Sequence, residues 1–136
     1  MYYKVVTKVF DDYASSQCHD NVWCIYYVVG KWAEADKRMK ILGYGPLVFN
    51  DLERARRFAM RYAHGRKQYI FECSVEGERE TPTLYLESSI YYLYNYGTSR
   101  DNCNPIPTPN GTIMVDHMRL DKMVGYYNRG EWVDVC

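Results

Sequence analysis

The stretch LVFNDLERARRFAMRYAHGRKQYIFECSV, residues 47–75, decides the fold of this chain. It joins a short apolar segment at 47–49, a helical repeat at 51–63 and an alternating segment at 68–75. The apolar side chains of the repeat recur every three or four positions and share one helix face: Leu52, Ala55, Ala59, Tyr62 and Ala63. The stretch therefore predicts a strand, a helix over 51–63 and a second strand.

The ends of this helix also carry recognisable signals. Asn50 is a suitable N-cap, and Glu53 follows three residues later, as a capping box requires. Gly65 supplies the left-handed residue that ends a helix, and His64 suits the negative end of the helix dipole.

Alternating or β-branched segments on either side predict further strands, at 2–10, 22–29 and 112–120. Between them, polar residues predict loops over 11–21 and 98–111, and a turn over 127–131. The order of these elements predicts a single α+β domain over 1–136, in which a mostly antiparallel sheet packs against one main helix, 51–63.

The segment 84–96 fits two structures. Leu86, Ile90 and Leu93 have the spacing of a second helix, whereas the tyrosines at 92, 94 and 96 have the spacing of a strand face. The tyrosines at 91–96 could form a stacking platform for bases, but this half of the chain is acidic, which favours packing in a core or interface.

Length and composition limit the class of protein. The chain has 136 residues, of which 47% are hydrophobic and 25% charged, and these proportions are typical of a globular domain. The longest apolar run, at 22–29, is too short to span a bilayer, and no leader pattern opens the chain. We therefore expect a cytoplasmic protein, in the cytoplasm of the host cell if it is viral.

The five cysteines predict neither a disulfide framework nor a metal centre. Their number is odd, and no pair has C-x-x-C spacing. Cys18, His19 and Cys24 are close in the sequence but lack a second pair of ligands. We expect no metal and no cofactor, and free thiols at all five positions: Cys18, Cys24, Cys73, Cys103 and Cys136.

Charge is neutral overall but unevenly distributed. Residues 31–67 hold ten basic and four acidic side chains, whereas residues 68–136 hold five basic and ten acidic ones. A net charge of zero argues against a dedicated DNA-binding protein. The basic half nevertheless predicts a local surface that suits an acidic partner.

That surface is predicted on the helix over 51–63. Arg54, Arg57 and Arg61 lie within about 60° of one another on the side opposite the apolar stripe. Arginines in a row bind phosphates or carboxylates well, although a solvated helix face is the simpler interpretation and Glu53 can pair with Arg57. The predicted binding residues are Arg54, Arg57, Arg61, Tyr62, Arg66 and Lys67.

Motifs for catalysis are missing from the sequence. It has no G-x-S-x-G, Walker A, H-E-x-x-H or G-x-G-x-x-G pattern. His117 follows Asp116 in a predicted strand, so alternation places the two side chains on opposite faces. We therefore expect no catalytic residues.

Five segments together resemble a group of small domains common in bacteriophages and large viruses: YYKVV at 2–6, IYYVVGKW at 25–32, GPLVFNDLERARRFA at 45–59, YIFECSV at 69–75 and PNGTIMVDHMRL at 109–120. The resemblance covers most of the chain and rests on structural elements. It implies a viral accessory protein, a class that often acts against host defences, anti-CRISPR inhibitors included.

A second resemblance is to ADP-ribosyltransferases, in which a short aromatic strand also precedes a helix with small residues, as GPLVF precedes ARRFA here. That family needs an Arg or His on its first strand and a late Glu. This chain offers Lys4, Thr7 and Lys8 there, and Asp116 late. Its Glu78-Arg79-Glu80 has a Glu-x-Glu spacing but precedes the serines that it should follow. The resemblance implies a related fold whose transfer chemistry is absent or altered.

Three hypotheses follow. The first is a non-enzymatic, phage-type protein that binds and inhibits a host protein or nucleoprotein complex with an acidic surface. The alternative is an enzyme or sensor that handles a nucleotide, and the third is a nucleic-acid-binding module. No membrane partner is expected.

Overall fold

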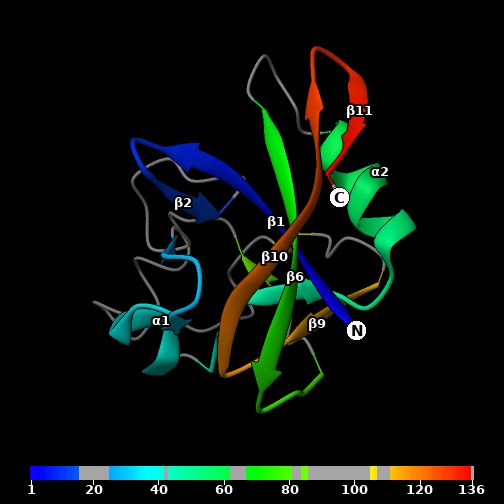
Figure 1. The fold of residues 1–136 in the computed structure, drawn as a ribbon. Coiled ribbons are helices and arrows are strands. Elements are labelled where there is room, and N and C mark those ends of the chain that lie inside the picture. The colour runs from blue at the N-terminus through cyan, green and yellow to red at the C-terminus, as the bar shows by residue number, and fades with distance from the viewer. Residues whose placement is uncertain are drawn as a thin grey trace.

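The computed structural model describes residues 1–15, 25–41, 43–61, 67–80 and 111–135, and the backbone alone at 84–85 and 105–106. Its main feature is a nine-stranded sheet in which every pairing is antiparallel. Three long strands form its centre, and Figure 1 shows them crossing the molecule: β1 (Tyr2–Val9), β6 (Gln68–Glu76) and β10 (His117–Asn128).

Shorter strands extend this centre on both sides. The order β11-β10-β6-β1-β2-β3 adds β11 (Glu131–Asp134), β2 (Asp12–Ser15) and β3 (Tyr26–Tyr27). Three more pair beside this path: β4 (Trp32–Ala33) with β10, β5 (Leu47–Phe49) with β1, and β9 (Thr112–Met114) with β5. A separate pair consists of β7 (Leu84–Tyr85) and β8 (Pro105–Ile106).

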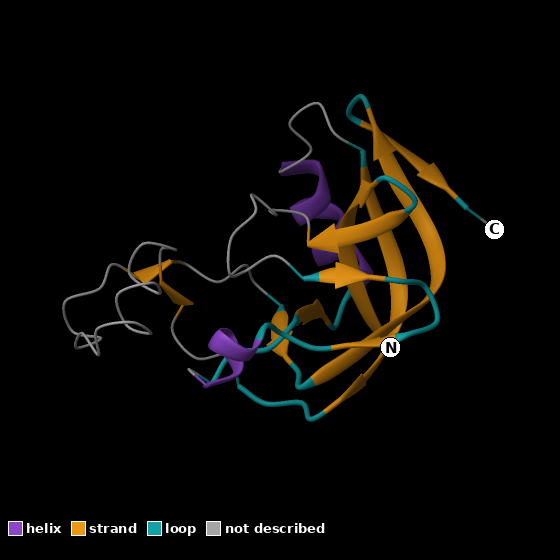
Figure 2. Ribbon diagram, turned by 90° about the vertical axis from the view of Figure 1, so that its left-hand side faces the viewer, coloured by secondary structure: helices purple, strands orange, loops and turns teal. Residues whose placement is uncertain are grey.

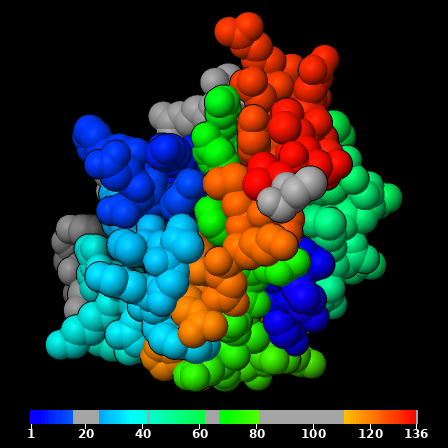
Figure 3. Space-filling model, viewed as in Figure 1, coloured from blue at the N-terminus to red at the C-terminus, as the bar shows by residue number. Residues whose placement is uncertain are grey.

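The sheet curls back on itself through a short connection. β3 continues the β1–β2 edge, and a turn at Val29–Gly30 brings the chain to β4, which pairs with β10. The Gly30 amide donates a hydrogen bond to the Leu120 carbonyl on β10. Figure 3 shows the segment 25–41, in light blue and cyan, lying against β10, in orange.

One face of the sheet is covered by helix α2 (Leu52–Arg61), as Figures 1 and 2 show from two directions. Ala55 and Ala59 lie against the strands and are fully buried. Their small side chains let the helix approach the sheet closely. The core on this face contains Val5, Phe49, Ala55, Ala59, Ile70 and Tyr127.

The opposite face encloses a second core, inside the curl of the sheet. Its buried residues are Val6, Tyr27, Val48, Phe71, Cys73, Val115, Met118 and Leu120. Successive residues of β1 and β6 alternate between the two cores, and both strands are therefore buried on both faces over much of their length. A short helix, α1 (Lys37–Ile41), packs through Met39, which is also buried.

The predicted fold class is confirmed: the domain is α+β, with an antiparallel sheet and one main helix. The predicted strand at 47–49 and the helix are present, but the N-cap is one residue later than expected. Asp51, not Asn50, accepts hydrogen bonds from the amides of Glu53 and Arg54 at 2.7 and 3.2 Å. The helix is described to Arg61, so residues 62–63 of the predicted range lie outside the described part.

Three predicted elements need correction. Residues 12–15 of the predicted loop over 11–21 form β2, because they pair with the end of β1. In the predicted strand over 22–29, Val28 and Val29 are exposed. The chain turns there, because the Lys31 amide donates a hydrogen bond to the Val28 carbonyl. The predicted strand over 112–120 breaks after Met114. There the Val115 amide donates a hydrogen bond to the Pro46 carbonyl, and the Asp116 amide donates one to the Glu76 carbonyl.

The predictions for the acidic half lie mostly outside the described residues. In the 84–96 segment, where a second helix was one alternative, Leu84–Tyr85 form a strand because they pair with Pro105–Ile106. The tyrosines at 91–96 and most of the 98–111 loop are outside the described part. No helix within the described part is long and apolar enough to cross a bilayer.

Candidate functional site

The outer side of α2 presents the predicted arginine row. Because Ala55 and Ala59 are packed against the sheet, positions Arg54, Arg57 and Arg61 point away from it, and all three are exposed. We call these three residues the arginine row. The Asp51 cap satisfies the first amides of the helix and so fixes where the row begins.

The arginines of α2 make contacts both within the helix and with neighbouring segments. Arg57 Nε lies 3.6 Å from Glu53 Oε1, which confirms the predicted pair. The side chain of Arg54 lies across Gly111, where a Cβ atom would collide with it. Arg56 belongs to a different environment, because its guanidinium lies 4.7 Å from the centre of the Trp132 ring and is half-buried.

The structure separates Lys67 from the arginine row. Its Nζ lies 5.3 Å from the centre of the Tyr126 ring. Tyr126 pairs with Tyr69 across the sheet and therefore shares the face opposite α2. Tyr62 and Arg66, the other predicted members, lie outside the described residues. The predicted set of six is therefore not one surface.

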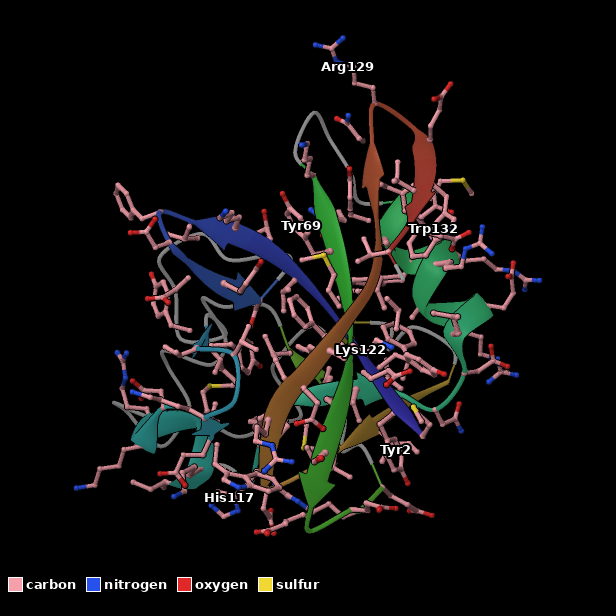
Figure 4. The ribbon with its side chains drawn as sticks, viewed as in Figure 1. Tyr2, Tyr69, His117, Lys122, Arg129 and Trp132 are labelled. Atoms are coloured by element: carbon pink, nitrogen blue, oxygen red, sulfur yellow. The ribbon has the colours of Figure 1, made fainter. Side chains whose placement is uncertain are left out.

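A second group of aromatic side chains was not foreseen. Tyr13 on β2, Tyr69 on β6 and Tyr126 on β10 form a row across the face opposite α2, and each is partly exposed. The ring centres of Tyr13 and Tyr69 are 5.6 Å apart, as are those of Tyr69 and Tyr126. We call these three residues the tyrosine row; Figure 4 labels Tyr69 in the upper half of the sheet.

Only the pairing of distant strands makes this row. Tyr13 and Tyr126 are more than one hundred residues apart in the chain. The high tyrosine content, 15 residues, was the one signal in the sequence, but it does not show which rings meet.

A buried lysine lies on the same face as the tyrosine row. Lys4 is only 9% exposed, and its Nζ donates a hydrogen bond to the Leu47 carbonyl at 2.7 Å. The Tyr27 ring centre is 5.7 Å from that nitrogen, and within the described ranges the buried Tyr27 hydroxyl has no hydrogen-bond partner of ordinary geometry. Burial lowers the pKa of Lys4 to about 8.

Near this lysine, Cys73 is a free, buried thiol. Burial raises the pKa of Cys73 to about 12, which keeps the thiol protonated and unreactive at neutral pH. The prediction of a free thiol is confirmed at this position, and the other four cysteines lie outside the described residues.

Two further candidate groups are on the surface. His117 Nε2 lies 3.0 Å from Glu34 Oε2, a carboxylate that also pairs with Lys40 at 2.9 Å. Asp116 instead pairs with Arg79 at 3.1 Å, which agrees with its predicted separation from His117. Within the described ranges, no three His, Cys, Asp or Glu side chains are arranged to hold a metal ion.

Comparison of the chain with protein-family models, with curated proteins and with solved structures found no match.

Proposed function

We propose that the protein acts by binding, without catalysis of its own, and that the arginine row on α2 contacts an acidic surface on a partner macromolecule. The observation that carries this proposal is the exposure of Arg54, Arg57 and Arg61 on one side of a helix whose other side is fixed to the sheet. Packing of Ala55 and Ala59 on the sheet holds the backbone positions of the three arginines in a constant arrangement.

The chemistry of the row favours a partner rich in carboxylates. A guanidinium group is always charged and binds a carboxylate through two parallel hydrogen bonds. Arginine is also enriched among the residues that contribute most to protein interfaces. The likeness to viral accessory domains makes a host protein the first partner to examine, with inhibition as the consequence of covering its surface.

The test is a triple charge reversal, Arg54→Glu with Arg57→Glu and Arg61→Glu. A matched control reverses three exposed lysines elsewhere, Lys31, Lys37 and Lys122, and changes the net charge by the same amount. Affinity for a partner captured by the wild type is measured by surface plasmon resonance, beside a thermal melt of each variant.

The arginine variant should lose at least about 100-fold in affinity, because it removes attraction and adds repulsion across the interface, whereas the control should bind normally. Both should melt close to the wild type, because exposed substitutions change stability little. Equal binding by the wild type and the arginine variant would show that the row is only a solvated face. A nucleotide-handling protein would likewise keep its activity in the arginine variant.

A further inference from the structure

Phe10 is an unusual residue type for its position in the fold. It is the first residue of the turn between β1 and β2, it is 94% exposed, and its φ is 55°. A bulky residue rarely adopts a positive φ, and Gly or Asn would adopt it at lower cost. Two-residue hairpin turns use a positive φ at this position, and Arg129 in the β10–β11 turn has a similar φ of 53°. A ring that is 94% exposed nevertheless adds little to the stability of the domain.

The position of this ring connects it to the tyrosine row. Lys8 lies directly opposite Tyr13 in the β1–β2 pair, so the two side chains share a face. Phe10 follows Lys8 by two residues and begins the turn that leads to β2. The β1–β2 arm, in blue, projects at the upper left of Figure 3 beside β6 and β10. The exposed phenyl ring therefore lies at the tip of the hairpin whose second strand carries Tyr13.

Positive charge accompanies the rings. Lys8 is exposed beside Tyr13, and Lys67 is exposed with its ammonium near the Tyr126 ring. The acidic residues nearby, Asp11 at the hairpin tip and Glu131 opposite Asn128, are at the two margins of the row. The interior of the surface thus offers three partly exposed tyrosine rings, whose neighbouring planes are inclined by 70° and 37°, with a cation at each end.

We propose that Phe10 and the tyrosine row form a platform on which the bases of a single-stranded nucleic acid stack, while Lys8 and Lys67 pair with its phosphates. Every base has a flat face that stacks on an aromatic ring, so this type of site needs no sequence-specific hydrogen bonds. The platform is on the face of the sheet opposite α2. It is therefore independent of the function proposed for the arginine row.

The first experiment measures binding of a fluorescein-labelled 12-nucleotide oligothymidine by fluorescence anisotropy at low salt. Phe10→Gly should weaken binding roughly 5- to 150-fold, the loss expected for one stacking ring. The same variant should melt at the wild-type temperature or higher, because glycine relieves the strained φ. Loss of affinity without loss of stability is the signature of a functional residue.

A matched control removes an exposed aromatic ring from elsewhere. Trp32 is 45% exposed and pairs with Arg119, on the face away from the tyrosine row. Trp32→Leu should bind the oligonucleotide like the wild type. The arginine-row variant should also bind it normally, which separates this proposal from the function proposed above.

The salt dependence tests the lysines. Two phosphate contacts predict a slope of about −1.4 in a plot of log affinity against log salt concentration, and Lys8→Gln or Lys67→Gln should each reduce it by about 0.7. A duplex of the same sequence should bind more weakly, because its bases are not free to stack. Inorganic polyphosphate, which has no bases, should compete poorly.

Several results would overturn the proposal. The wild type could fail to bind the oligonucleotide, and the exposed Phe10 ring would then be assigned to contact with a protein instead. Phe10→Gly could bind as well as the wild type, or polyphosphate could compete as well as the oligonucleotide. Loss of binding in the arginine-row variant with none in Phe10→Gly would place the nucleic acid on α2 instead.

Discussion

The two faces of the central sheet differ in the polar and charged side chains that they bury. On the face under α2, two alanines lie against Val5 and Ile70, and the described polar side chains buried there, Thr7 and Gln68, are uncharged. On the opposite face, a lysine is buried beside the Tyr27 ring, and partly exposed tyrosines line the sheet toward the strained Phe10. Both faces hold packed cores, and the second also carries a buried positive charge.

The largest effect should come from a cavity on the helix face. Ile70 on β6 is completely buried between the strands and α2. Ile70→Ala should lower the free energy of unfolding by about 2–5 kcal/mol, because it removes apolar contacts and leaves a void. Urea denaturation measures this change.

Val133→Ala is the control, since Val133 is 37% exposed and its truncation should change stability by no more than about 0.5 kcal/mol. If Ile70→Ala is as mild as this control, the packing under α2 contributes little to stability, and the contrast between the two faces is lost.

On the other face, removal of a buried side chain, Lys4, is expected to raise the free energy of unfolding. In the unfolded chain Lys4 has its ordinary pKa of 10.5, and in the fold its pKa is about 8. The unfolded state therefore binds more protons between pH 8 and 10.5, and the stability of the wild type should rise with pH across that window. Below pH 8 the buried ammonium should cost about 3 kcal/mol.

Lys4→Met tests this cost. The variant should be more stable than the wild type at pH 7 by up to about 3 kcal/mol, with a difference that shrinks as the pH rises from 8 to 10.5. Urea titrations of both proteins at pH 7, 8, 9 and 10 measure the difference, with Lys8→Met as an exposed control on the same strand. A difference that does not depend on pH would mean that the ammonium is not the source of the cost.

The smallest effect concerns the start of α2. Asp51→Ala removes the acceptor for two helix amides and should cost about 1 kcal/mol. Asn50→Ala, at the position that the sequence favoured, should cost less. Thermal unfolding of the two variants measures both losses of stability. A larger loss of stability in Asn50→Ala would show that Asn50, the predicted residue, is the N-cap.

Much of the helix face could be predicted from the sequence because its signals are local. The spacing of Leu52, Ala55 and Ala59 shows which side of the helix is buried, and the exposure of Arg54 and Arg57 follows from the same period. The cap was displaced by one residue, because Asn50 and Asp51 are both good caps and only the backbone decides between them.

The opposite face could not be predicted, because its contacts join residues far apart in the chain. Lys4 is exposed or buried according to whether Tyr27 and the Leu47 carbonyl lie over it. Its sequence pattern, a lysine between apolar residues at a strand, is typical of a solvent-facing position. The tyrosine row depends in the same way on strands that pair across the whole domain.

The sequence by itself therefore determined the α+β class, the main helix and the side of it that carries the arginines, since periodicity and composition act within a few residues. Only the tertiary structure decided that Lys67 lies beside the Tyr126 ring and apart from the arginine row. It also decided that Lys4 is buried without an acidic partner among the side chains described. Pairing between distant strands makes these contacts, and the free energy of that pairing is shared by the whole sheet rather than by any one segment.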